Sequence, residues 1–206
     1  NTATGSVAFA IGRDNTASGA SGSTAIGYNN TASGLEGSTA SGRSNDASGN
    51  NGCAAIGKTN TASGANGSTA IGQGNTASGK FGTTAIGYTN TASGEDGSTA
   101  IGYTNEASGY NGSTAIGQSN EASGDYGCTA IGYTNTASGN DGCTAIGRGV
   151  INTTNGAQEI GSRSAGLRLG ASRIHDNGQV AQTVNVSATP LTASAAAVGS
   201  EANGEL

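Results

Sequence analysis

Apolar positions in residues 1–149 recur at a fixed distance along the chain. Ala and Ile return in the same phrase every fifteen residues, as in "NTASGANGSTAIGQG" at residues 60–74. Each unit divides into halves of eight and seven residues, and Gly closes the Thr-Ala phrase of each half. A short phrase bounded by Gly and Asn is typical of a strand followed by a tight turn, because both residues tolerate positive φ. The pattern therefore predicts two short strands in every fifteen residues.

The tandem repetition also predicts how these strands are arranged. Units this short cannot satisfy their backbone alone and must stack on their neighbours. We expect an all-β fold, a flattened two-sheet parallel β-solenoid (β-roll) of 15-residue coils wound left-handed. Ten coils in residues 1–149, at ~4.8 Å each, would make a rod of about 48 Å. The Asn that begins each coil is expected to form a side-chain ladder along this rod.

The period fails after Gly149, and we assign residues 150–206 to a C-terminal capping region and tail. Two segments of alternating character, 166–172 and 179–187, are predicted strands. A cap would protect the unpaired edge strands at the end of a solenoid. Residues 192–206 are expected to be loose.

Substitutions in the repeat indicate which side chains point outward. The Thr position of the first half holds Asp46, Glu106 and Glu121 in three coils. A carboxylate in a thin core would cost several kcal/mol, so this column is predicted to face water and the adjacent Ala to point inward.

The second half of the unit allows two interpretations. Burying its Ile column would contribute ~1.5–3 kcal/mol for each side chain. Burying its Ala column instead explains why Ala is never replaced, since two closely packed sheets leave room for nothing larger. We favour Ala inward in both halves, which places the Thr and Ile of the second half on an outer face.

Composition and charge restrict the possible partners. The net charge is -5, and the eight Lys and Arg are scattered, so we expect no nucleic-acid partner. No apolar run approaches the ~18 residues of a membrane span, so no membrane insertion is expected. Cys128 and Cys143 hold the same position in adjacent coils, with Cα atoms ~4.8 Å apart, and either a disulfide or two buried thiols fits them.

Catalytic chemistry is not predicted. Glu106 and Glu121 would lie ~5 Å apart, a separation that retaining glycosidases use. No third polar group accompanies them, so we interpret them as two solvated charges. His175 is the single histidine and stands outside the repeats. No phosphate-binding loop or metal-ligand spacing is present, so we expect no enzyme, no cofactor and no metal.

Large side chains gather at the predicted turns. Four tyrosines share one turn column with Arg43, Lys58 and Arg148. We interpret them as solvated turn residues that lend solubility. A strip of aromatic rings for binding sugars is the alternative, although Arg, Lys and Gln interrupt the column.

The phrases of the repeat resemble two known families over residues 1–149. The phrase N-T-A-S-G resembles the N-x-V-x-G phrase of the perennial ryegrass antifreeze protein, a β-roll with seven- and eight-residue halves. Its Val points inward and its flanking Thr and Ser outward, which implies Ala inward here. The phrase S-T-A-I-G resembles the head repeat of bacterial trimeric autotransporter adhesins. In that family the residues flanking Ala point inward, which would bury Thr24 and Ile26.

Two functional hypotheses follow. The first is a secreted or extracellular monomer that binds an ice crystal surface through a flat, uncharged Thr/Ile face with spacings of ~4.8 Å and about 6.7 Å. The stiff β-branched side chains would lose little entropy on docking. The second is an adhesin-head-type surface interaction module that forms a trimer with Ile in its core. The predicted ice-binding residues are Thr24, Ile26, Thr39, Ile56, Thr69, Ile71, Thr84, Ile86, Thr99, Ile101, Thr114, Ile116, Thr129, Ile131, Thr144 and Ile146.

Overall fold

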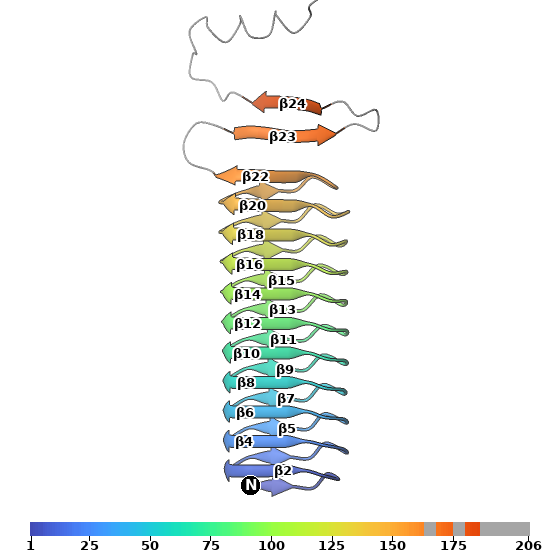
Figure 1. Ribbon diagram of the computed structural model, residues 1–206, viewed down its shortest axis with the longest axis vertical. Helices are drawn as coiled ribbons and strands as arrows, with labels where there is room; N and C mark the ends of the chain where they lie inside the picture. Colours follow the sequence, from blue (N-terminus) through green and yellow to red (C-terminus); the bar gives the residue numbers. More distant parts are fainter. Residues whose placement is uncertain (163–167, 175–179, 186–206) are drawn as a thin grey trace, which may run out of the picture.

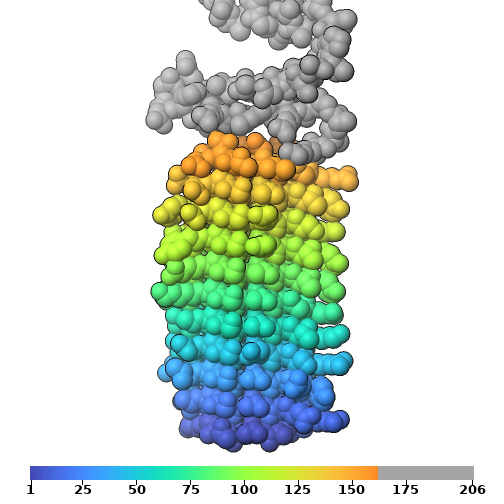
Figure 2. Space-filling model, turned by 180° about the vertical axis from the view of Figure 1, so that it is seen from behind, coloured from blue at the N-terminus to red at the C-terminus, as the bar shows by residue number. Residues whose placement is uncertain are grey.

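The computed structural model is a rod of stacked coils (Figure 1). It describes residues 1–162, 168–174 and 180–185, and the side chains of residues 1–161. Two parallel sheets of eleven strands each form the two flat sides of the rod, which confirms the predicted all-β solenoid. In the space-filling view, the coils stack in even layers from the N-terminus, in blue, to the residues near 160, in orange (Figure 2).

One sheet consists of two-residue strands from the first half of each unit. They are β1 (Thr2–Ala3), β3 (Thr16–Ala17), β5 (Thr31–Ala32), β7 (Asp46–Ala47), β9 (Thr61–Ala62), β11 (Thr76–Ala77), β13 (Thr91–Ala92), β15 (Glu106–Ala107), β17 (Glu121–Ala122), β19 (Thr136–Ala137) and β21 (Ile151–Asn152).

The other sheet consists of five-residue strands from the second half. They are β2 (Phe9–Arg13), β4 (Thr24–Tyr28), β6 (Thr39–Arg43), β8 (Ala54–Lys58), β10 (Thr69–Gln73), β12 (Thr84–Tyr88), β14 (Thr99–Tyr103), β16 (Thr114–Gln118), β18 (Thr129–Tyr133), β20 (Thr144–Arg148) and β22 (Gln158–Ser162).

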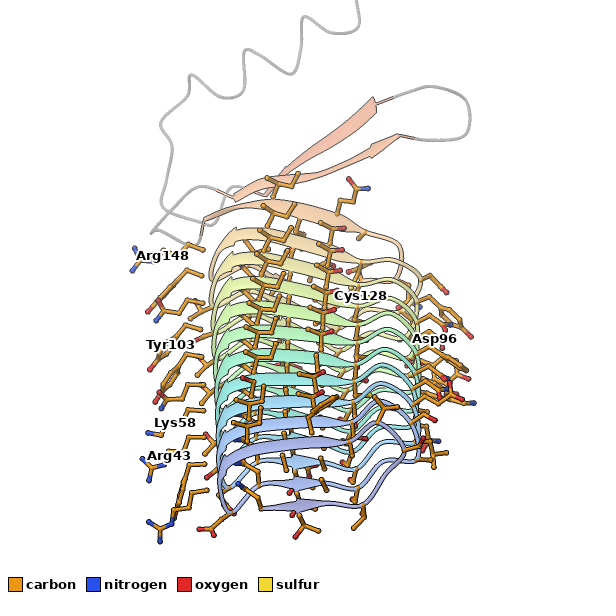
Figure 3. The ribbon with its side chains drawn as sticks, turned by 60° about the horizontal axis from the view of Figure 1, so that its bottom comes forward. Arg43, Lys58, Asp96, Tyr103, Cys128 and Arg148 are labelled. Carbon is orange, nitrogen blue, oxygen red and sulfur yellow. The ribbon has the colours of Figure 1, made fainter. Side chains whose placement is uncertain are left out.

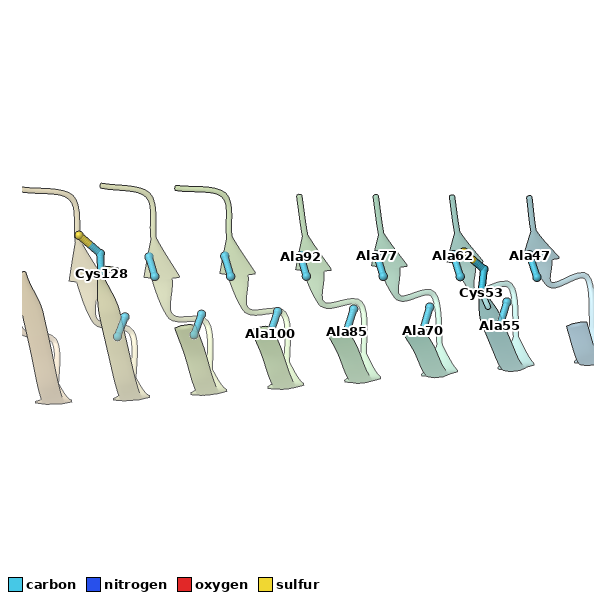
Figure 4. Close-up of a cluster of buried hydrophobic side chains, with 14 of the residues drawn as sticks. Ala47, Cys53, Ala55, Ala62, Ala70, Ala77, Ala85, Ala92, Ala100 and Cys128 are labelled. Carbon is cyan, nitrogen blue, oxygen red and sulfur yellow. The ribbon is translucent and has the colours of Figure 1, made fainter. Parts of the chain in front are cut away.

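Alanine fills the space between the two sheets, as predicted. Ala92 of β13 and Ala100 of β14 are both fully buried, and the equivalent Ala side chains repeat this arrangement along the rod (Figure 4). Gly64 shows how closely the coils pack, since a Cβ at this position would collide with the carbonyl oxygen of Gly79 in the next coil. The space between the facing Ala columns therefore has no room for a larger side chain, and the Thr and Ile of the long strands lie outside it.

A buried asparagine ladder holds successive coils together, as the fixed Asn position predicts. Asn90 is fully buried, and its backbone N–H donates to Oδ1 of Asn75 at 2.9 Å. Its Nδ2 donates to the Asn75 Oδ1, to the Ile86 carbonyl at 2.9 Å and to the Gly102 carbonyl at 2.8 Å. The side chain thus satisfies backbone groups of its own coil and of both neighbouring coils.

The two sheets continue past Gly149, one coil beyond the predicted ten. β21 pairs with β19, and β22 pairs with β20 after a step of fourteen residues, so that Thr144 lies beside Gln158. Val150 takes the ladder position, and its N–H still donates to Oδ1 of Asn135 at 2.9 Å. Backbone pairing therefore extends the solenoid where the sequence repeat has already decayed.

Beyond this coil, β23 (Arg168–Ile174) and β24 (Val180–Asn185) pair antiparallel, in the two segments predicted to be strands. The predicted loose tail, 192–206, and His175 lie outside the described residues.

Candidate functional site: the faces and edges of the rod

The rod presents two faces and two edges, and Figure 3 shows side chains projecting from both edges. We call the outer surface of the five-residue strands the Thr/Ile face and that of the two-residue strands the short-strand face. The basic edge is formed by the last residue of each long strand. The acidic edge is formed by the turn residues that precede each long strand, such as Glu36 and Asp96.

The Thr/Ile face lies on the outside of the coil, so the orientation favoured from the sequence is confirmed. In β14, Thr99 and Ile101 are half-buried while Ala100 between them is fully buried. Ile26 is 39% exposed because it lies beside Ser41, which covers less of it than Ile would. No charged residue occupies the Thr or Ile positions from β4 to β20, and all residues predicted for ice binding lie on this face.

The register of the long strands makes this face regular in two directions. Thr99 lies beside Thr84 and Thr114, and Ile101 lies beside Ile86 and Ile116. The result is a flat array of methyl groups and hydroxyls with a complete core behind it. Such an array is suited to contact with another flat, regular surface.

The short-strand face carries charge, as the sequence predicts. Glu106 and Glu121 are exposed neighbours on β15 and β17. Ser123 Oγ donates a hydrogen bond of 2.8 Å to the carboxylate of Glu121. No group of three or more His, Cys, Asp or Glu side chains suited to a metal ion occurs in the part of the chain that the structure describes. The geometry fits two solvated carboxylates.

The basic edge is a stacked column of long side chains. Tyr88 and Tyr103 stack with ring centroids 5.0 Å apart and planes inclined by 6°. The Arg148 guanidinium lies 5.4 Å from the ring centroid of Tyr133, and Arg13 lies 5.5 Å from that of Tyr28. These contacts hold the cations and rings in an ordered column, with Arg43, Lys58, Tyr103 and Arg148 pointing away from the rod (Figure 3).

The acidic edge contains one cation among its carboxylates. Lys80 Nζ lies 3.2 Å from the Glu95 carboxylate and 5.2 Å from the Phe81 ring centroid. The hydrogen bond from Lys80, followed by one from Tyr110, lowers the pKa of Glu95 below its usual value. The same contact with Glu95 raises the pKa of the Tyr110 hydroxyl.

The three cysteines lie in the buried Ser column as unbonded thiols. The Cys143 thiol lies with its Sγ 2.9 Å from that of Cys128, while the Cys128 thiol donates to the Gly139 carbonyl. Burial, and secondly the contact with Cys128, raises the pKa of Cys143 to about 12. The sequence left open a disulfide or two buried thiols at these positions, and the structure contains two buried thiols.

Sequence reasoning missed the separation of charge between the two edges. Among residues 1–161, four of the five basic side chains occupy the basic edge, namely Arg13, Arg43, Lys58 and Arg148. Five of the ten acidic side chains occupy the acidic edge, namely Glu36, Glu95, Asp96, Asp125 and Asp141. The signal was present in the repeat columns, but it has meaning only once each column is assigned to one side of the rod.

Comparison with known proteins gives one match. The family model described as YadA head domain repeat (2 copies) matches residues 2–30, 20–35, 65–83, 80–103, 96–112 and 111–127. Together these segments cover just under half of the chain. No curated protein and no solved structure matches this chain. Repeats similar to the YadA head support the adhesin-head interpretation better than ice binding, for which no comparison gives direct support.

The coils without a family match have the same geometry as the others. Residues 36–64 carry Ser41 for Ile, Asp46 for Thr and Ala54 for Thr, yet β6, β7 and β8 pair in the common register. These substitutions change outward side chains and leave the Ala and Asn positions intact, so the fold is retained. No described segment forms a helix long and apolar enough to cross a membrane.

Proposed function

We propose that this chain is an adhesin-head-type surface interaction module in which three copies associate around one axis through their Thr/Ile faces. The Thr/Ile face is the observation that carries this proposal. It is uncharged, flat and half apolar, and the chain has no need of it for its own core, which Ala and Asn already fill. The similarity of the repeats to the YadA head supports the same reading.

The dimensions of the Thr/Ile face fit an interface. Ten coils at ~4.8 Å and a five-residue strand of about 13 Å give roughly 600 Å². Monomers rarely expose an apolar patch larger than about 300–600 Å². A stable pairwise interface buries about 800 Å² per partner, so this face, which a ring of three copies divides between two neighbours, needs the side chains of both edges to complete each interface.

Association through this face leaves the short-strand face turned outward. Its carboxylates, Glu106 and Glu121, would stay in water, where they carry little penalty. A rigid rod of this kind holds each outward column at a fixed spacing for contact with a partner surface. The function we infer is therefore display of repeated side-chain columns outside the cell, without catalysis.

A charge placed on the Thr/Ile face tests this function. Ile101→Lys would bury an unpaired ammonium between copies and is expected to abolish association in light scattering. Thr76→Lys, on the outward position of the short strand β11, is the matched control and should associate like the unaltered chain. Both variants should keep the circular dichroism of the solenoid. Association of Ile101→Lys at unaltered strength would contradict the proposal.

Ice binding is a second candidate for the same face. Its support is the regular array of outward Thr and Ile, in which Thr99 and Ile101 repeat at ~4.8 Å between coils. A monomeric chain that causes thermal hysteresis, and loses it in Thr99→Tyr, would favour ice. A chain without hysteresis would exclude this candidate and leave the adhesin-head function in place.

A further inference from the structure

The two edges of the rod carry opposite charges at matching heights, and this inference rests on the association proposed above. β6 is preceded on the acidic edge by Glu36 and ends on the basic edge with Arg43. β20 is preceded by Asp141 and ends with Arg148. Each of these two levels therefore has a carboxylate on one edge and a guanidinium on the other.

Among the residues whose side chains the structure describes, these four charges have no ion-pair partner. The ion pairs among residues 1–161 are Arg13 with Asp14, at 3.3 Å, and Lys80 with Glu95, at 3.2 Å. Both edges stack in register, since Glu36 bridges to Ser21 and Asn51 while Arg43 pairs with Tyr28 and Lys58. The unpaired charges thus occupy fixed heights along the rod.

Rotation about an axis parallel to the rod brings unlike edges together. When each Thr/Ile face points to this axis, the basic edge of one copy meets the acidic edge of the next. A closed ring involves rotation without translation along the axis, so each level meets the same level of its neighbour. An antiparallel face-to-face pair would instead place basic edge against basic edge.

We propose that Arg43 and Arg148 of each copy pair with Glu36 and Asp141 of the neighbouring copy. These ion pairs favour a ring in which all rods run in the same direction and the basic edge of each copy contacts the acidic edge of the next. The Thr/Ile face supplies the apolar contact. Opposite charges at matching heights favour one orientation and register of neighbouring copies. In an antiparallel arrangement, like charges meet and destabilise the interface.

The remaining levels fit the same arrangement without a like-charge contact. Tyr103, at the end of β14, would meet Glu95 and Asp96, and its hydroxyl can donate to a carboxylate. Tyr88 would meet Lys80, which allows a cation–π contact. Lys58 would meet Asn51, which is uncharged. Every cation on either edge therefore faces a carboxylate, an aromatic ring or a neutral side chain.

Charge reversal with rescue tests this pairing. The double variant Arg43→Glu, Arg148→Glu places like charges together at two levels of every interface. One exposed ion pair contributes little, so the double variant reverses two levels at once. We expect the dissociation constant of each interface to rise by about ten-fold or more at low salt. The quadruple variant, which adds Glu36→Arg and Asp141→Arg, reverses both edges and should associate with itself as the unaltered chain does. When a size tag distinguishes the two chains, it should associate with the unaltered chain about ten-fold or more weakly than with itself, because each mixed interface again holds like charges at two levels.

Lys58, on the basic edge, provides the matched control. Lys58→Glu faces Asn51 and should change association less than two-fold. Circular dichroism on each variant reports whether the solenoid is intact. Unweakened association of the double variant, or failure of the quadruple variant to recover, would overturn the edge pairing while leaving the Thr/Ile association standing. An unaltered chain that remains a single copy would overturn both.

Discussion

Replacing one rung of the asparagine ladder tests how the rod is held together. In Asn90→Ala, the buried N–H of Asn105 loses its acceptor, the Asn90 Oδ1 at 3.0 Å. The carbonyls of Ile86 and Gly102 lose donors at 2.9 Å and 2.8 Å. An orphaned buried group costs about 1–3 kcal/mol and each lost hydrogen bond about 0.5–1.5 kcal/mol, so the free energy of unfolding should fall by about 2–6 kcal/mol.

The assay is denaturant unfolding followed by circular dichroism, with all variants at one protein concentration because association is linked to stability. Ser93→Ala is the matched control in the same coil, since Ser93 is exposed and its loss should cost less than about 0.5 kcal/mol. A loss in Asn90→Ala no larger than in this control would refute the reasoning that the ladder stabilises the stack.

Three further predictions concern the faces, the core and the thiols. Thr99→Tyr adds bulk to the outer face, so light scattering should show lost association. At dilutions where both chains are single copies, the free energy of unfolding should change by less than about 0.5 kcal/mol, and a much larger fall there would contradict the outward orientation. Ala100→Phe has no space between the sheets and should cost ~1–3 kcal/mol or more in the same unfolding assay, whereas an unchanged midpoint would contradict an alanine core. The pKa of Cys143 is raised from 9.0 to about 12, so the unfolded chain loses its proton first and stability should fall as pH rises through that window. Cys143→Ser introduces the residue that the coils carry most often at this position. Its melting temperature should depend less on pH across the same range.

The repeat pattern predicted most of the fold because each column has one physical role. Glu106 in a Thr column identified an outward position, and the unvarying Ala identified the core. The Asn ladder followed from its fixed place at a turn. All three inferences depend on alternation within a strand and on stacking between coils, which the sequence displays directly.

Other features could not be predicted, because they depend on backbone pairing or on comparing opposite sides of the rod. The eleventh coil forms although its sequence departs from the repeat, since the pairing of Thr144 with Gln158 needs backbone groups and tolerates other side chains. The opposition of Glu36 and Arg43 is hidden in the sequence, where six residues of turn and strand separate them. The sequence pattern could not distinguish ice from a second copy as the partner of the Thr/Ile face, because both require a flat, uncharged array.

The molar mass of the full chain in dilute solution is the measurement closest to the central claim, that copies associate through the Thr/Ile face. Sedimentation equilibrium at micromolar concentration should give about three times the chain mass of 19.6 kDa. The Ile101→Lys variant should give the mass of one chain under the same conditions. A mass of one chain for the unaltered protein, at every concentration reached, would contradict the account.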